Sequence, residues 1–225
     1  MTYELILLDA DGTLFDYDRA EKYAIETTFG DFGLDYSDAI LARYRVVNDA
    51  LWKELERGNI TSGELRVERF RRLLAEIREA DAEALSRRYL HHLARGSYLI
   101  DGAEDICRYM ARRYTLAILT NGITEVQRSR LGKSALHEII SHIIISEEVG
   151  FSKPDPRIFE YAMSMFGHPR RETVLMVGDS LSSDIRGGVN AGIDTCWYNP
   201  HGAPCSEDLA PTREIRTLQE LRQLL

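Results

Sequence analysis

The sequence is poor in cysteine and has no long apolar run, and both absences narrow the classes of protein that it fits. Its three cysteines, Cys107, Cys196 and Cys205, are too few and too scattered for a disulfide framework or a zinc site. No apolar run approaches the ~20 residues of a membrane-spanning helix, and the first residues show no secretory signal. We therefore expect a cytoplasmic protein with no membrane partner.

Basic residues are in deficit as well. The chain has 28 Lys and Arg against 36 Asp and Glu, a formal net charge of −8 at pH 7. This balance argues against a general nucleic-acid-binding surface. An acidic protein still binds a small anionic phosphate where a metal ion and a local cation invert the field. The 225 residues suffice for one large domain or for a core with a smaller insert, and we infer no obligate protein partner.

Two acids directly follow the first apolar run of the chain. The run, Leu5–Leu8, is typical of a buried strand in a parallel sheet. Asp9 and Asp11 come next, and side chains two residues apart leave a strand on the same face. Gly12 permits a sharp turn away from the sheet. Because such close carboxylates repel one another, either a metal cation binds them or one acid keeps its proton. The pattern suits a metal-assisted nucleophile beside a general acid/base.

A helical block separates this first strand from the rest of the sheet. From about Ala20 to Arg95 the sequence is strongly helical, and Thr61 with Glu64 fits a capping box that opens one helix. Apolar residues spaced by three and four follow that box: Val67, Phe70, Leu73, Leu74 and Ile77. We predict about four helices and no strand here, forming a cap inserted into the sheet domain.

After Gly96 the pattern changes to alternating helices and strands. The predicted strands cover residues 116–119, 143–145, 174–177 and 195–198. Predicted helices begin at Asp101 as N-cap, at the segment Lys153 to Pro156, at Leu181 and after Thr217. Strands that alternate with helices predict an α/β protein with a parallel, doubly wound sheet.

Polar residues follow several of these strands and converge on one edge of the predicted sheet. Besides Asp9 and Asp11, these are Thr120 and Asn121, Asp179, and Lys153 in the loop after the third strand. Asp184 follows Asp179 by five residues. It is either an acid behind the site or a first-turn acid favoured by the helix dipole.

This set has a coherent chemistry. Asp9 and Asp179 are suited to Mg²⁺, a hard cation that prefers oxygen ligands. Lys153, Thr120 and backbone N–H groups are suited to phosphate oxygens. A carboxylate that attacks phosphorus forms an aspartyl-phosphate, and Asp11 is placed to protonate the leaving oxygen and then to deprotonate the hydrolytic water.

Four motifs in order resemble those of the haloacid dehalogenase-like hydrolases. They are Asp9-Ala10-Asp11-Gly12-Thr13-Leu14, Thr120-Asn121-Gly122, Lys153-Pro154-Asp155-Pro156, and Gly178-Asp179-Ser180 with Asp184. Any one alone is weak, but their joint occurrence is specific. The resemblance implies a Rossmann-like core of residues 1–15 and 96–225, with a helical cap of residues 16–95.

The resemblance also implies roles for the motif residues. Asp9 is the nucleophile, and Asp11 is the acid/base that also binds the metal through its backbone carbonyl. Thr120 and Lys153 bind the phosphate, with Asn121 and Gly122 beside them. Asp179 is a metal ligand. Because the dehalogenases of the family lack the second carboxylate of the first motif, Asp11 favours a phosphatase over a dehalogenase.

A finer resemblance concerns the cap. Asn48, Leu51-Trp52, Glu56-Arg57-Gly58, Ile60-Thr61 and Arg69-Phe70 resemble the house-cleaning pyrimidine 5′-nucleotidase branch of the family. This implies a nucleoside monophosphate substrate, for which Phe15, Tyr17, Asn48 and Trp52 are candidate contacts. The alternatives are a phosphatase for phosphoglycolate, sugar phosphates or other small metabolites, and then a 2-haloacid dehalogenase or a non-catalytic binding module.

Overall fold

The chain divides into two compact units. The computed structural model describes residues 3–75, 80–205 and 209–225. One unit, here called the core unit, comprises Met1–Tyr17 and Ser97–Leu225, and the other, the helical unit, comprises Asp18–Gly96. The boundaries expected from the sequence, 16 and 95, lie within two residues of these.

The core unit is built on a six-stranded sheet with the order β3-β2-β1-β4-β5-β6. The strands are β1 (Leu5–Leu8), β2 (Thr115–Thr120), β3 (His142–Ile145), β4 (Val174–Gly178), β5 (Asp194–Tyr198) and β6 (Arg213–Ile215). Every neighbouring pair runs parallel. The five predicted strands and the parallel sheet are confirmed. β6 was not predicted, because its three residues include a single apolar side chain, Ile215.

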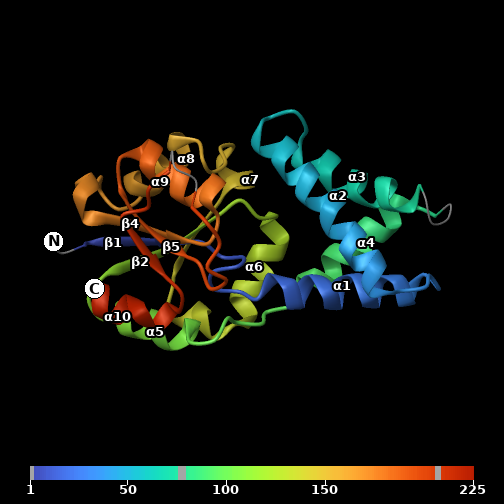
Figure 1. Cartoon of the computed structure of the whole chain (residues 1–225), viewed down its shortest axis with the longest axis horizontal. Helices are drawn as coiled ribbons and strands as arrows, with labels where there is room; N and C mark the ends of the chain where they lie inside the picture. Colours follow the sequence, from blue (N-terminus) through green and yellow to red (C-terminus); the bar gives the residue numbers. More distant parts are fainter. Residues whose placement is uncertain (1–2, 76–79, 206–208) are drawn as a thin grey trace. The chain divides into compact units, whose positions relative to one another are not determined.

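Both faces of the sheet are covered by helices, as a doubly wound sheet requires. In β1, Ile6 and Leu8 point into the same cluster as residues of α5 (Ala103–Met110) and α10 (Leu221–Leu224). Leu5 and Leu7 point into a second cluster, with residues of α8 (Pro156–Ser164) and α9 (Arg186–Ala191). Figure 1 shows these two pairs of helices on opposite sides of the sheet. The unbroken apolar run of β1 therefore reflects a strand buried on both faces.

The remaining elements of the core unit are short. α6 (Thr124–Lys133) and α7 (Ser146–Val149) follow β2 and β3. A π-helical turn, Leu181–Ile185, leads directly into α9, so the helix predicted from 181 to about 191 is present in two segments. Three 3₁₀ turns also lie among the described residues of the unit: Ala135–Glu138, Arg171–Thr173 and Leu218–Glu220.

Most predicted helix ends are confirmed, and one is wrong. Asp155 caps α8, with Pro156 in the first turn, and Thr217 forms a capping box before the last helical segment. Asp101, however, does not cap α5. The N-cap is Gly102, whose φ of +82° is left-handed. A left-handed residue favours glycine, so the chain enters α5 one residue later than the acid would indicate.

The helical unit contains four helices and no strand among its described residues, as predicted. They are α1 (Tyr17–Asp31), α2 (Asp38–Glu56), α3 (Ser62–Leu74) and α4 (Ala82–Leu93). Tyr44, Phe70 and Tyr89 form its centre, with ring centroids 5.4–5.8 Å apart. Of the predicted apolar stripe, Phe70, Leu73 and Leu74 are buried, and Ile77 lies outside the described residues. None of the described helices is long and apolar enough to span a membrane.

The capping box of α3 gives a stability prediction. The Thr61 hydroxyl accepts from the Glu64 backbone N–H at 3.2 Å, and a Glu64 carboxylate oxygen accepts from the Thr61 backbone N–H at 2.8 Å. We expect Thr61→Ala to lower the free energy of unfolding by about 1 kcal/mol, because the helix loses a cap. Thr61→Ser keeps the hydroxyl and is the matched control. Urea unfolding measures both, and an alanine variant as stable as wild type would contradict the box.

Candidate active site

The candidate site lies where the strand order of the sheet reverses. β1 and β4 are neighbours at the centre, with β2 and β3 on one side and β5 and β6 on the other. Leu8 is opposite Val177 in the register, so Asp9 and Asp179 leave these strands at the same carboxyl edge. The Asp9 backbone N–H donates to the Val177 carbonyl at 2.9 Å. Open α/β sheets bind their ligands in the crevice at such a switch point.

A buried ammonium group occupies the centre of the site. Lys153 is 1 % exposed. Its Nζ donates to Asp9 Oδ1 at 2.5 Å, to Asp184 Oδ1 at 2.6 Å and to the Leu119 carbonyl at 2.7 Å. Burial by itself disfavours the charged form, but the charges of Asp184 and Asp9 outweigh it and hold the lysine pKa above its usual range. Lys153 is therefore a cation that uses all three of its N–H groups.

The side chain of Asn121 fixes the backbone of this lysine. Its Oδ1 accepts from the Lys153 N–H at 2.8 Å, and its Nδ2 donates to the Lys153 carbonyl at 2.8 Å. The neighbouring Thr120 is 2 % exposed, and its hydroxyl accepts from the Gly122 N–H at 3.1 Å. The motif after β2 and the lysine loop after β3 are thus joined through an amide.

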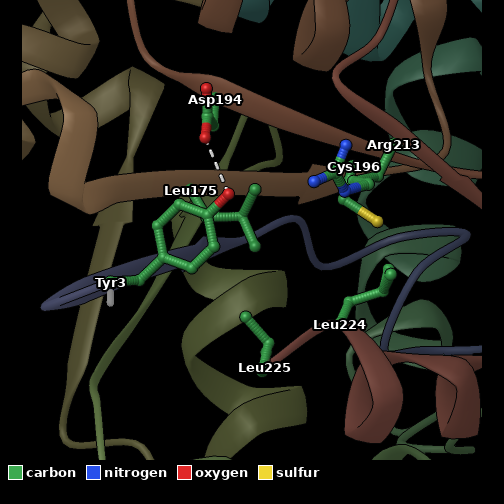
Figure 2. A pocket seen from close by; sticks show the side chains of 7 residues that line it. All are labelled: Tyr3, Leu175, Asp194, Cys196, Arg213, Leu224 and Leu225. Atoms are coloured by element: carbon green, nitrogen blue, oxygen red, sulfur yellow. Dashed lines mark hydrogen bonds between the residues drawn. The ribbon is translucent and has the colours of Figure 1, made fainter. Parts of the chain in front are cut away.

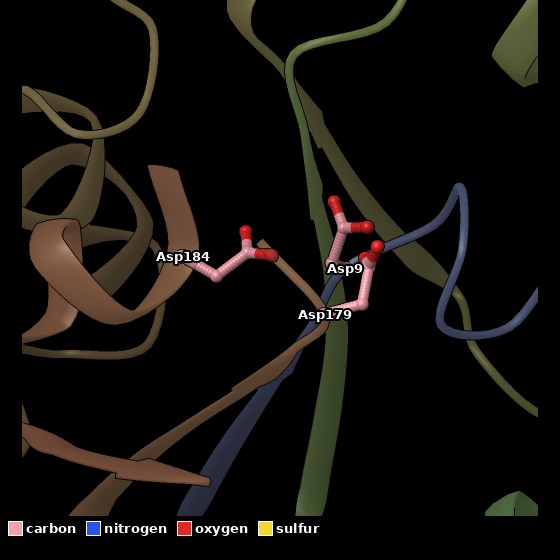
Figure 3. A group of neighbouring side chains, drawn as sticks. All are labelled: Asp9, Asp179 and Asp184. Carbon is pink, nitrogen blue, oxygen red and sulfur yellow. The ribbon is translucent and has the colours of Figure 1, made fainter. Parts of the chain in front are cut away.

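Three carboxylates meet around Lys153. Figure 3 shows Asp9, Asp179 and Asp184, and one oxygen from each lies within 4.8 Å of the others. Burial, and then the Asp184 charge, raises the pKa of Asp179 to about 7. Burial also raises the pKa of Asp9 well above its ordinary value, with Lys153 opposing the shift and both neighbouring acids adding to it. One lysine leaves this group with excess negative charge, which favours a cation with oxygen ligands.

Two glycines allow these acids to approach the backbone. Gly12 has a φ of +86°, and a Cβ there would lie 2.5 Å from Asp179 Oδ2. A Cβ at Gly178 would collide with the Asp184 carboxylate. Asp184 is 0 % exposed, and its Oδ2 accepts from the Ser180 N–H at 3.0 Å, which buries it in the site rather than at a solvated helix start. The Thr13 hydroxyl donates to Asp179 Oδ1 at 3.1 Å.

Asp11 has its own partners. Its Oδ1 accepts from Nη1 of Arg130, and its Oδ2 accepts from Gln127 Nε2 at 2.6 Å. Both donors belong to α6. The two acids of the first motif therefore pair with different cations, Asp9 with Lys153 and Asp11 with Arg130.

A family comparison gives the same assignment as these motifs. Residues 3–192 match the model of the haloacid dehalogenase-like hydrolases. The chain belongs to this family. It is a hydrolase with the family's α/β core and helical cap, as the sequence motifs predicted.

Three relatives cover the whole chain. Pyrimidine 5′-nucleotidase PynA of Streptococcus pneumoniae is 38 % identical over 100 % of this chain and 96 % of its own length. Pyrimidine 5′-nucleotidase YjjG of Escherichia coli is 36 % identical over 100 % of this chain and 99 % of its own length. The magnesium-bound crystal structure of the HAD-hydrolase YfnB from Bacillus subtilis superposes with a TM-score of 0.94 at 38 % identity, covering 100 % and 99 %.

The candidate substrate residues of this hydrolase have different environments. Phe15 is 1 % exposed, and the Arg130 guanidinium lies 4.7 Å from its ring centroid. Tyr17 is half-buried at the start of α1. Asn48 is buried and Trp52 is half-buried, and their spacing of four places them on the same face of α2. The structure gives Phe15 a place in the core, and contact of all four residues with substrate stays a prediction.

The sequence analysis gave no role to Thr13 and Ser180, although both stand in its motifs, and it missed Gln127 and Arg130. Thr13, Ser180, Gln127 and Arg130 all donate to its carboxylates. Gln127 and Arg130 lie in the helix that follows the Thr120-Asn121-Gly122 motif. They are three residues apart, which places them on one face of that helix. That spacing was a usable signal, but the burial of an arginine was not readable from sequence.

A separate cavity lies at the opposite edge of the sheet. It has a volume of about 230 Å³, and its lining includes Tyr3, Leu175, Asp194 and Arg213, which lie at or before the amino ends of strands (Figure 2). The Tyr3 hydroxyl donates to Asp194 Oδ2 at 2.7 Å. The four motifs do not reach this cavity.

The raised pKa of Asp179 gives a prediction for the metal-free chain. Its folded-state pKa of about 7 exceeds the ordinary 3.8, so its contribution to stability is present at low pH and is lost as the pH rises through about 7. In EDTA, we expect Asp179→Asn to raise the free energy of unfolding at pH 8 by on the order of 1–3 kcal/mol, and by less at pH 5.

Urea unfolding at both pH values measures this difference. Asp105→Asn is the control, because the Asp105 carboxylate is exposed and pairs with Arg222 at 2.7 Å. The hydrogen bond from Arg222 lowers the pKa of Asp105. We therefore expect Asp105→Asn to give no gain in the free energy of unfolding at pH 8. An Asp179→Asn gain that is the same at pH 5 and pH 8 would contradict the raised pKa.

Proposed function

We propose that this hydrolase is a Mg²⁺-dependent phosphomonoesterase that cleaves pyrimidine nucleoside 5′-monophosphates through an aspartyl-phosphate on Asp9. The observation that carries the proposal is the Asp9 carboxylate at the switch point of the sheet, with one oxygen held by Lys153. The substrate class rests on two full-length relatives that are pyrimidine 5′-nucleotidases.

The residues of the site fit a magnesium ion. Oxygen atoms of Asp9, Asp179 and Asp184 lie within 4.8 Å of one another, and Lys153 alone does not neutralise them. Asp9, Asp179 and the Asp11 carbonyl would hold the ion, with Asp184 beside them. When bound, Mg²⁺ supplies positive charge that stabilises phosphate oxygens in the transition state. The YfnB structure, which is 38 % identical, is bound to magnesium, and this supports magnesium as the ion.

Asp9 is suited to act as the nucleophile. Lys153 holds Oδ1, and Oδ2 has no hydrogen-bond partner within the described part of the chain, so Oδ2 is the oxygen that attacks phosphorus. A bond forms between Oδ2 and phosphorus as the bond from phosphorus to the sugar oxygen breaks. Lys153 and Thr120 then bind the phosphate oxygens, together with backbone N–H groups at Asn121 and Gly122. For this, one Lys153 N–H leaves its present acceptor, and the Gly122 N–H leaves the Thr120 hydroxyl.

Asp11 completes both half-reactions. As an acid it gives its proton to the departing sugar oxygen, and as the resulting carboxylate it takes a proton from water. That water attacks the phosphorus of the aspartyl-phosphate, which releases inorganic phosphate and restores Asp9. The presence of Asp11 favours this chemistry over dehalogenation, and the intact acids disfavour a non-catalytic binding module.

We assign substrate choice to the helical unit, residues 18–96, which corresponds to the predicted cap of residues 16–95. Asn48 and Trp52 are its candidate contacts, and Phe15 and Tyr17 are candidates from the core unit. A phosphoglycolate, sugar-phosphate or other small-metabolite phosphatase would use the same core residues and differ only in these contacts. The cytoplasm, inferred from the cysteine content, stays the predicted location.

A substrate panel tests the proposed function first. We expect phosphate release from UMP, dUMP and dTMP in Mg²⁺, and a loss of at least about 100-fold in EDTA, because the carboxylate cluster lacks its cation. AMP, phosphoglycolate and sugar phosphates complete the panel. A preference for phosphoglycolate or a sugar phosphate would overturn the nucleotidase assignment while keeping the phosphatase. Halide release from 2-haloacids without phosphate release would overturn both.

The nucleophile has its own test. Asp9→Asn keeps the size of the side chain but removes the attacking carboxylate, so we expect UMP turnover to fall by about 1,000-fold or more. Asp155→Asn is the matched control, since asparagine also caps a helix and Asp155 is the half-buried N-cap of α8. Steady-state phosphate release measures both variants. Substantial turnover by Asp9→Asn would exclude the aspartyl-phosphate.

A further inference from the structure

Two side chains of α6 hold the Asp11 carboxylate. Gln127 Nε2 donates to Oδ2 at 2.6 Å, and Nη1 of Arg130 donates to Oδ1. The residues are three apart, so both reach out from one face of the helix. Each carboxylate oxygen therefore has its own donor, which defines both the position and the rotation of the group.

Arg130 is an unusual residue for a helix surface. Its side chain is 0 % exposed, while the Asp11 side chain is 27 % exposed. The Arg130 guanidinium also lies over the Phe15 ring, at 4.7 Å from the centroid. Burying a charge is costly unless the charge is paired, so the buried position of the Arg130 guanidinium depends on its pairing with the Asp11 carboxylate. The arrangement directs a fixed cation at one acid of the first motif.

Gln127 adds a property that arginine lacks. It is 2 % exposed, and its Oε1 is buried without a hydrogen-bond partner among the described residues. A half-turn of the amide would present Oε1 to a protonated Asp11, which has an O–H to donate. Gln127 can thus hold the acid as well as the carboxylate, whereas a guanidinium only donates.

The glycine of the second motif makes room for this contact. A Cβ at Gly122 would lie 2.6 Å from Gln127 Cγ, and closer still to its Nε2. The short segment from Thr120 to Gly122 therefore serves two purposes. It carries the proposed phosphate ligands, and it allows the following helix to bring Gln127 against Asp11.

We propose that Gln127 and Arg130 are positioning residues that hold Asp11 in place to protonate the leaving oxygen. The inference rests on the proposed function, because Asp11 has this task only in a phosphomonoesterase. A purely structural role for the pair predicts a different outcome. It would weaken folding and lower activity on all substrates alike.

The leaving group separates the two roles. The value of kcat/KM reports steps up to departure of the leaving group, and the sugar oxygen of UMP needs a proton at that point. The nitrophenolate of 4-nitrophenyl phosphate departs without one. We expect Gln127→Met and Arg130→Met to lower kcat/KM for UMP by about 10–100-fold, but for 4-nitrophenyl phosphate by less than about 3-fold.

Three further variants serve as references and controls for this experiment. Asp11→Asn removes the acid itself and should show the same selectivity in stronger form. Arg130→Lys keeps the charge without the guanidinium fork, and should retain more UMP activity than Arg130→Met. Arg128→Met is the matched control on α6, because Arg128 is exposed and pairs with Glu148 at 2.6 Å. Arg128→Met should leave kcat/KM unchanged for both substrates.

The outcomes are distinct. An equal loss on both substrates, or an unchanged value for UMP, would overturn the positioning role. If Arg130→Met fails to fold, as judged by circular dichroism, Gln127→Met decides the question because it removes no charge. If the wild-type protein turns over neither substrate in Mg²⁺, the proposed function fails and the inference fails with it. Wild-type turnover without selective loss in the variants rejects the inference alone.

Discussion

The buried ammonium group of Lys153 joins four parts of the core unit at one point. It binds Asp9 after β1, the Leu119 carbonyl within β2 and Asp184 in the π-helical turn, and it comes from the loop between α7 and α8. Without this cation, two buried carboxylates would face one another in a region of low dielectric, at a cost of several kcal/mol. The approach of the acids that defines the site therefore depends on the lysine, and the lysine on the acids.

The acids of the site pair with different basic residues. Lys153 pairs with Asp9 and Asp184, whereas Arg130 pairs with Asp11. Asp179 has no salt bridge to a lysine or arginine among the described residues, and its carboxylate accepts a hydrogen bond from the Thr13 hydroxyl at 3.1 Å. Its pKa is accordingly raised to about 7, mainly by burial. This uneven distribution gives different partners to the acids that we propose as the nucleophile, the acid/base and a metal ligand, all at one edge of the sheet.

Local signals in the sequence predicted most of the fold. The apolar runs gave the strands because a strand covered on both faces needs apolar side chains throughout. Asp155 with Pro156, and Thr61 with Glu64, gave helix starts because caps are formed by neighbours in sequence. β6 was not predicted because a three-residue edge strand has too few side chains to show an alternation of apolar and polar residues. The Asp101 cap was wrong because a left-handed glycine preceded α5.

The sequence by itself determined which residues follow β1, β2 and β4, and hence that Asp9, Asp11, Thr120 and Asp179 share the carboxyl edge of the sheet. Only the tertiary structure decided how they pair. Asp11 and Arg130 are 119 residues apart, and Lys153 and Asp9 are 144 apart. Strand and helix periods are written in neighbouring residues, whereas the partner of a buried charge depends on how distant elements pack. Pairing of that kind leaves no pattern in the linear chain.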